Sequence, residues 1–462
     1  MKLRLSGLFL IVLLTGCVAN RPFHMTFEPC TIGDNTNPCK MIRSQPTNSI
    51  QRYVGSEPSE NYLLGFVEFD DQGQLFDRRQ LTVLTDELSA DAASQDLLMI
   101  LFVHGWRHNS EETDGNLASF REILKGLSTL ETAVSRHKGR DPRKVVGVYI
   151  GWRGLSVDAV GLTYLTFWDR KNTAHKVGHN GLLEVLSRME LIKNIRNESL
   201  AGAASTNATQ LVVIGHSFGG AVIYSALAHI LMERFIDTAV RGRLDKDTRG
   251  FGDLVVLLNP AFEALQFKTL REMAKSRAYP ETQVPVIAVL TSEADTATGF
   301  WFPFGRFFSS LFEDYHADER DEDRTALGHY DPHITHDLYF ADYASSDDDP
   351  SSDGSNCPSG GVTSAAKKSD TRSLENRLQS ELADFQDVKE GWDSDEYGFI
   401  GFPGSELEHH LDKSGLRNPY LNIRVDKLII PDHDTVYCKR VRDFIRHLII
   451  LSSPKTEAST GN

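Results

Sequence analysis

The chain has 462 residues, of which 40% are hydrophobic and 24% are charged, enough for one large domain with insertions or for two domains. Its 49 basic and 64 acidic side chains give a formal net charge of −15. This balance argues against nucleic acid as a partner, because the sequence offers no basic stripe that would neutralise phosphates.

The N-terminal stretch MKLRLSGLFLIVLLTGC has the form of a targeting segment. Lys2 and Arg4 precede an apolar run that is too short to span a membrane, and the run ends in Leu-Thr-Gly-Cys17. This resembles a bacterial lipoprotein signal, which implies cleavage before Cys17, lipid on its thiol and anchoring in the cell envelope. Val18 in place of Asp implies the outer membrane, if the source has one. The alternative is an ordinary secretory signal with a chance cysteine.

Residues 1–16 are therefore expected to be a signal peptide, and the polar, turn-rich residues 17–60 a tether. Residues 61–70 and the QLFDRRQLTVLT run after them predict a β-hairpin. Strand-like and helix-like runs then alternate, which predicts an α/β fold with a mostly parallel sheet and helices on both faces. The expected strands are 97–103, 144–152, 210–215, 253–259, 284–292 and 424–430, and the expected helices are 116–130, 181–195, 221–235, 261–274 and 441–451.

The alternation stops between about 296 and 423, which predicts a large insertion before the last strand. Within it, residues 344–373 are acidic and of low complexity, as in disordered segments. We therefore expect a core over 61–295, an insertion or lid over 296–423, and a C-terminal strand, loop and helix over 424–462.

Besides Cys17, the chain contains Cys30, Cys39, Cys357 and Cys438. Export would permit disulfides, and four cysteines allow three pairings, among which the sequence does not choose. One pairing closes the short loop from Cys30 to Cys39 and would leave Cys357 to join Cys438.

The stretch LVVIGHSFGGAVIY places Ser217 in a G-x-S-x-G pattern between a predicted strand and a predicted helix. Small residues are needed there, because a serine on a sharp turn requires the strand and helix backbones to approach closely. From about residue 97 the chain resembles the α/β-hydrolase superfamily, of the lipase and esterase kind. The resemblance implies an α/β-hydrolase fold and a nucleophilic Ser217. The alternative is a tight turn without chemistry.

The resemblance also implies an oxyanion hole, a pair of backbone N–H groups that would bind the charged oxygen of the intermediate. One would come from the residue after the nucleophile, Phe218, and one from the His104-Gly105-Trp106 loop, near Trp106 or Gly105. His104 precedes Ser217, whereas the superfamily places its catalytic histidine last, so we expect His104 to shape the loop.

The acid is expected after a later strand, where Asp295 is the candidate and Glu293 the fallback. Asn259 occupies the position after the preceding strand where some lipases have their acid, but an amide cannot stabilise an imidazolium. The base is expected to be His433, between the last strand and the closing helix. Seven other histidines follow the acid and are less suitable by position: His316, His329, His333, His336, His409, His410 and His447.

Two aromatic segments leave their roles open. Residues 299–312 would line an acyl pocket, form a lid, contact the membrane or simply cover the sheet. Tyr164, Phe167 and Trp168 would belong to a cap over the cleft. His329, His333 and His336 have helix-face spacing, but Pro332 interrupts a helix there, so we favour a solvated acidic loop over a metal site.

The sequence thus predicts a lipid-anchored serine hydrolase that cleaves carboxylic esters, with no metal or organic cofactor and with an ester or lipid as substrate. The alternatives are an acyltransferase that uses the same residues and a non-catalytic interaction module of the cell envelope. A complete Ser-Asp-His set argues against the module, which has no need of all three groups in order.

Overall fold

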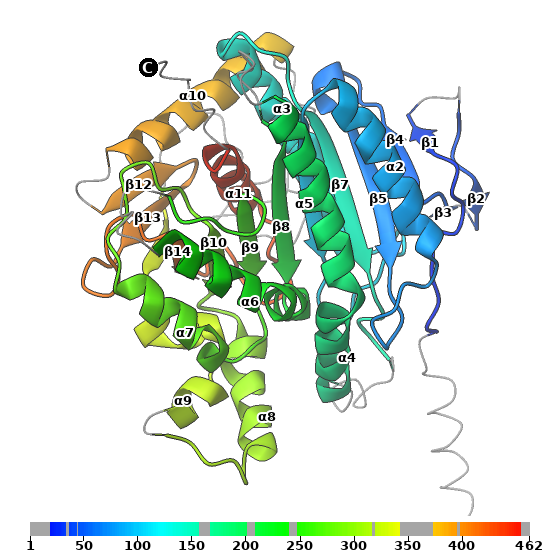
Figure 1. Cartoon of the computed structure of the whole chain (residues 1–462). Coiled ribbons are helices and arrows are strands. Elements are labelled where there is room, and N and C mark those ends of the chain that lie inside the picture. Colours follow the sequence, from blue (N-terminus) through cyan, green and yellow to red (C-terminus); the bar gives the residue numbers. More distant parts are fainter. Residues whose placement is uncertain are drawn as a thin grey trace, which may run out of the picture.

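The computed structural model describes residues 19–33, 37–43, 45–156, 167–200, 208–239, 247–316, 319–341, 373–394 and 398–453. One large sheet runs through this part of the chain, with helices on both of its faces (Figure 1). Its strand order is β1-β4-β5-β7-β6-β8-β9-β10-β14-β11-β13-β12. The strands are β1 (Cys30–Ile32), β4 (Ile50–Tyr53), β5 (Tyr62–Glu68), β6 (Leu97–Val103), β7 (Lys144–Gly151), β8 (Gln210–His216), β9 (Leu254–Leu258), β10 (Ile287–Ser292), β11 (His336–Phe340), β12 (Phe399–Phe402), β13 (Ser405–His409) and β14 (Tyr420–Val425).

In the middle of the sheet, from β5 through β7, β6, β8, β9 and β10 to β14, every pair of neighbouring strands is parallel. The antiparallel pairs, β4–β5, β11–β13 and β12–β13, lie toward the two sides of the sheet. A separate small ladder joins β2 (Met41–Ile42) and β3 (Gln45–Pro46). The central strands β6 and β8 are buried along their whole length, which explains their continuous apolar sequences.

The helices form two layers. One face of the sheet packs against α2 (Arg78–Ser94), α4 (Phe167–His179), α5 (Gly181–Ser199), α6 (Phe218–Ala239) and α7 (Ala264–Lys275). The other face packs against α3 (Gly115–His137), α10 (Leu374–Asp393) and α11 (Lys439–Leu451). The predicted fold class is therefore confirmed as an α/β fold with a large, mostly parallel sheet and helices on both of its faces.

The remaining elements are short and follow the carboxyl end of β10 or lie in the connections. They are η1 (Pro58–Glu60), the π-helical η3 (Ala297–Trp301), α8 (Phe302–Ser309), α9 (Glu319–Arg324), η4 (Leu327–His329) and η5 (Asp331–His333). No helix in the described ranges is both long enough and apolar enough to cross a membrane.

The predicted hairpin after residue 61 is wrong. The expected first strand is β5, but most of the expected second strand belongs to the helix α2. Between the two, the antiparallel pairing is limited to an isolated bridge from Phe69 to Leu75. The Asp77 carboxylate accepts a hydrogen bond from the Arg79 amide and so caps the helix. Leu81, Leu84 and Leu88 are buried at helical spacing. This helical pattern extends further along the chain than the strand-like alternation of apolar and polar residues in QLTVLT, and the helix forms.

The prediction of a tether over residues 17–60 is also wrong for most of that range. β1 and β4 belong to the main sheet, where β4 pairs antiparallel with β5. The Cys30–Cys39 disulfide closes a loop beside β1, and Ile50 is buried against the core. Cys438 is likewise disulfide-bonded, and Cys357, the partner that this pairing would require, lies outside the described residues.

The segment 296–423 is more than an insertion over the sheet. β11, β12 and β13 extend the sheet beyond β14, and α10 packs on the face covered by α3. The strand predicted at 424–430 instead runs from Tyr420 to Val425, because its pairing with β10 starts at Tyr420. The acidic stretch 344–373 lies outside the described residues except for its last residue, Ser373, which caps α10.

Candidate active site

Ser217 lies on the sharp turn between β8 and α6, at the carboxyl edge of the sheet. Its backbone φ is +55°, in the left-handed region that non-glycine residues rarely adopt. The turn is held because the Ser217 amide donates to the Leu258 carbonyl at 2.8 Å and the Ala261 amide donates to the Ser217 carbonyl at 3.1 Å. A Cβ on Gly219 would lie 2.1 Å from the Val103 carbonyl oxygen, so the helix can start this close to β6 only with glycine there.

Three side chains from three loops form one hydrogen-bonded line at this edge. His433 Nε2 lies 2.7 Å from Ser217 Oγ, and His433 Nδ1 lies 2.9 Å from Asp295 Oδ2. Because a carboxylate only accepts, Nδ1 carries the proton, which leaves Nε2 free to accept the serine proton. The structure therefore brings together Ser217, Asp295 and His433.

Asp295 lies three residues beyond the end of β10 and is almost fully buried. The amides of Ala297 and Thr298 donate to its Oδ1 at 2.9 and 3.1 Å, and the Thr298 hydroxyl donates to Oδ2. Burial opposes the charge, but His433 and these hydrogen bonds outweigh it and lower the pKa of Asp295 to about 2. The fallback acid, Glu293, is 49% exposed and lies near Arg424 instead.

The main chain of His433 is held by two further side chains. Its carbonyl oxygen accepts from His216 Nε2 at 2.9 Å and from Asn259 Nδ2 at 3.0 Å. Burial keeps the pKa of His216 well below its usual value, so its ring stays neutral. For His433, burial lowers the pKa, but the charge of Asp295 and its hydrogen bond raise it further, so the net shift is upward.

The loop after β6 passes directly beside the serine, since a Cβ on Gly105 would lie 2.9 Å from Ser217 Cβ. His104 Nε2 accepts from the Trp152 amide at 3.0 Å, so its Nδ1 carries the proton and donates to the Gly105 carbonyl at 3.0 Å. In a trans peptide the C=O and N–H point in opposite directions, so this bond also orients the Trp106 amide. Burial lowers the pKa of His104 to about 4, in keeping with the predicted structural role.

Phe218 is the first residue of α6, so its amide belongs to the first turn, where N–H groups have no carbonyl of the same helix to bind. The rings of Trp106 and Phe218 both contact Phe167, the first residue of α4, with centroids 5.3 and 4.8 Å apart. Phe167 thus lies beside the loop as the predicted cap would. Tyr164 and the side chain of Trp168 lie outside the described structure.

The histidines considered for a metal do not converge. His333 pairs with Glu322 at 2.8 Å, His329 Nε2 lies 2.9 Å from Thr298 Oγ1, and His336 stacks on His409. Among the residues that the structure describes, the atoms of His216, His433 and Asp434 are near enough, within 4.8 Å, to hold a metal ion together. The first two of these residues already use ring nitrogens in the hydrogen bonds given above.

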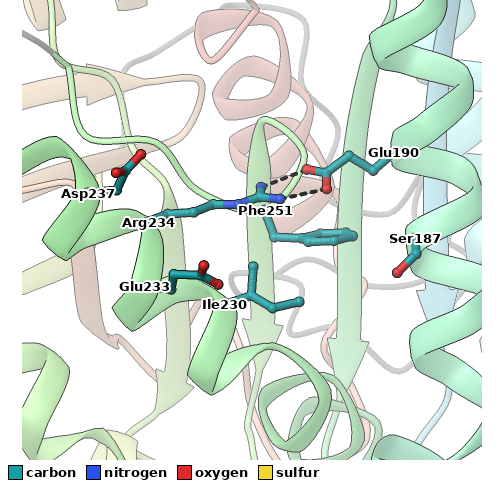
Figure 2. A pocket seen from close by; sticks show the side chains of 7 residues that line it. All are labelled: Ser187, Glu190, Ile230, Glu233, Arg234, Asp237 and Phe251. Atoms are coloured by element: carbon teal, nitrogen blue, oxygen red, sulfur yellow. Dashed lines mark hydrogen bonds and ion pairs between the residues drawn. The ribbon is translucent and has the colours of Figure 1, made fainter.

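A surface hollow of about 390 Å³ lies elsewhere, between α5 and α6 (Figure 2). Its one cation, Arg234, forms two hydrogen bonds of 2.7 Å with the carboxylate of Glu190 and another with the Gly250 carbonyl. The guanidinium is thus already neutralised, and Glu233 and Asp237 add acidic groups to the lining. The hollow offers no chemistry comparable to that at Ser217.

Sequence reasoning missed three residues at the site: His216, Asn259 and Thr298. Asn259 was considered only as a missing acid, yet its place after β9 at the carboxyl edge was a signal that its side chain faces the site. Thr298 follows Asp295 by three residues, the spacing at which a side chain can return to the carboxylate. Nothing local in the sequence connects His216 to His433.

No protein-family model matches the chain, and no curated protein matches it in sequence. One solved structure, a proposed YdeN-like hydrolase from Pectobacterium atrosepticum, is similar over 50% of this chain and 80% of its own, at 12% identity and a TM-score of 0.13. A likeness that weak says nothing about the reaction. The fold and the site define the class of protein without help from this comparison. It is an α/β protein with a serine, a histidine and a carboxylate in hydrogen-bonded contact at the carboxyl edge of a mostly parallel sheet.

Proposed function

We propose that this protein is a serine hydrolase that cleaves carboxylic esters, with Ser217 as nucleophile, His433 as general base and Asp295 as the acid that orients it. The observation that carries the proposal is the line of two hydrogen bonds, 2.7 and 2.9 Å long, that connects these side chains, with the serine on a strained turn. Such an arrangement suits nucleophilic acyl transfer.

In this mechanism Ser217 Oγ attacks the ester carbonyl carbon while its proton passes to His433 Nε2. The imidazolium is stabilised by Asp295 and returns the proton to the leaving alcohol as the C–O bond breaks. Water then attacks the acyl-serine and gives its proton to His433, which passes it to Ser217 Oγ as the acyl–Oγ bond breaks and the acid is released. The charged carbonyl oxygen would be bound by the amides of Phe218 and of Trp106 or Gly105, where the loss of one donor costs about 10²–10³ in rate.

We further propose that the protein is attached to the cell envelope by lipid on Cys17, in the outer membrane of a source that has one. What supports this is the N-terminal sequence, in which two cations, an apolar run and Leu-Thr-Gly-Cys17 follow one another. The substrate is then an ester or a lipid reachable from a membrane surface.

Labelling with a fluorescent fluorophosphonate tests the enzyme directly, because the probe reacts only with an activated serine. The wild-type protein should be labelled, whereas S217A and H433N should not. Equal labelling of wild type and S217A would refute the nucleophile. A panel of nitrophenyl esters of increasing chain length then measures hydrolysis, and added alcohol acceptors reveal any acyl transfer.

A further inference from the structure

An exposed apolar surface projects from the element that follows Asp295. We call it the aromatic surface; it consists of Phe300, Trp301, Phe304, Phe307, Leu311 and Phe312. Phe300 is 61% exposed and Phe312 is fully exposed. A soluble protein rarely gathers this many large apolar groups on one outer surface without a use for them.

The orientation of α8 is set from its other side. Phe302 is fully buried, and Arg306, one turn later, lies 3.2 Å from Glu263 and also pairs with Asp323. Glu263 is itself paired with the buried Lys171 of α4. The inward side of α8 thus carries Phe302 and the ion pairs, while Phe304 and Phe307 of the same helix are about half exposed. Phe300, in η3 before the helix, and Leu311, just after it, continue this exposed apolar series at helical spacing.

The position of this surface relative to the N-terminus suggests what it contacts. In Figure 1, α8 extends past the carboxyl ends of the strands. The described chain begins at the same edge, because the amides of Phe23 and His24 donate to the Glu68 carboxylate, at the end of β5, at 2.9 and 3.0 Å. Cys17 precedes Phe23 by only six residues, which reach about 20 Å when fully extended. A lipid on Cys17 would therefore hold this edge of the sheet close to a bilayer.

We propose that the aromatic surface docks on the bilayer and that Ser217, at the same edge, acts on esters of lipids taken from that membrane. The proposal rests on the hydrolase function and the lipid anchor proposed above and names the substrate class. The attraction is apolar, because the chain carries a net charge of −15 and Glu313 and Asp314 follow directly after Phe312, which disfavours anionic headgroups. Aromatic side chains are well suited to the boundary between headgroups and acyl chains.

Trp301 provides a direct test, since among the tryptophan side chains that the structure describes it is half exposed, whereas Trp106, Trp152 and Trp392 are buried. Full-length protein is bound to neutral phosphatidylcholine vesicles whose acyl chains carry bromine, which quenches tryptophan fluorescence on contact. We expect quenching in the wild type and its loss in W301F, with W392F quenched like the wild type. Equal quenching of wild type and W301F, or none in vesicle-bound protein, would overturn the proposal.

A second measurement uses the double variant F300S/F312S, with L191S/I195S as the matched control. Leu191 and Ile195 are 57% and 58% exposed but lie on α5, away from this edge. The first variant should hydrolyse a vesicle-embedded phospholipid ester about tenfold more slowly and a soluble short-chain ester at the wild-type rate, since less apolar surface is buried. The control should leave both rates unchanged. An equal loss in both double variants would contradict a specific docking surface.

Vesicle flotation of C17A, run in parallel, separates the failures. If F300S/F312S floats equally well with and without C17A, the lipid anchor is wrong, but Trp301 quenching still reports on the aromatic surface. If the fluorophosphonate fails to label Ser217, the hydrolase is wrong, and the same quenching result stands independently as evidence of membrane contact.

Discussion

The ring of His216 donates a hydrogen bond from Nε2 to the backbone carbonyl of His433, at 2.9 Å. The residue next to the candidate nucleophile thus holds the main chain of the candidate base, although the two are 217 positions apart. Asn259 donates to the same oxygen from the end of β9. The loop of His433 is therefore positioned by the two strands beside it, and its imidazole does not depend on Asp295 alone.

The first prediction concerns the two hydrogen bonds that His216 and Asn259 donate to the His433 carbonyl, which we call the clamp. In N259D a carboxylate replaces the amide, so the donor to the His433 carbonyl is lost and two oxygens repel each other. We expect kcat/KM for a soluble ester to fall about a hundredfold, as for other displacements of a catalytic group.

The matched control for the clamp is N422D. Asn422 is equally buried and its amide also donates to backbone carbonyls, those of Leu327 and His333. Both variants should be destabilised, as measured by thermal unfolding, but only N259D should lose most of its activity per folded molecule. Equal losses of activity would show that Asn259 acts through stability alone.

The second prediction concerns pH. His433 must be neutral to accept the serine proton, and its pKa is raised above 6.5 chiefly by Asp295 against the effect of burial. The kcat/KM of the wild type should therefore rise with pH, with a midpoint above 6.5.

In D295N the charge that raises the pKa of His433 is gone, so the midpoint should move to lower pH while the rate falls by about 10⁴. The pKa of Asp295 itself, lowered to about 2, keeps it charged throughout this range. An unchanged midpoint in D295N would show that Asp295 does not govern the base.

The third prediction concerns Thr298, whose hydroxyl donates to Asp295 and lies 2.9 Å from His329 Nε2. T298V keeps the shape but removes the donor, so the charge on Asp295 is less satisfied and attracts the His433 proton more strongly. The midpoint of the pH profile should move upward, with kcat reduced about tenfold. T298S keeps the hydroxyl and should have the wild-type midpoint. A loss of packing alone would not move the midpoint in T298V.

The fourth prediction concerns the turn at Ser217. In G219A the new Cβ would lie 2.1 Å from the Val103 carbonyl oxygen, a backbone atom that cannot move aside cheaply. We expect the free energy of unfolding to fall by about 3 kcal/mol or folded protein to be lost. G115A is the control, because a Cβ on Gly115, at the start of α3, meets no atom within 4 Å. Similar melting temperatures for G219A and the wild type would contradict the close contact.

Much of the fold was predictable, because strands buried on both faces have continuous apolar sequences that are hard to mistake. The strand predicted at 97–103 is β6, and the one predicted at 210–215 is β8 with one residue more. The predictions were wrong where the apolar residues fit both a helical and a strand-like repeat, and where polar strands near the edge of the sheet resemble loops. α2 was mistaken for a strand, and the polar residues before 60 hid β1 and β4, whose place in the sheet depends on pairing with β5.

The sequence by itself determined the order of the chemical groups, Ser217, Asp295 and His433, each after an expected strand, and the small residues that allow the turn at the serine. Only the tertiary structure decided that these groups meet, with Ser217 and His433 in hydrogen-bond contact across 216 positions, and that His216, Asn259 and Thr298 hold them. The physical reason is the separation along the chain of the residues that interact. Turns and helices follow from neighbouring residues, whereas the meeting of distant loops follows from the order of strands in the sheet, which no local pattern contains.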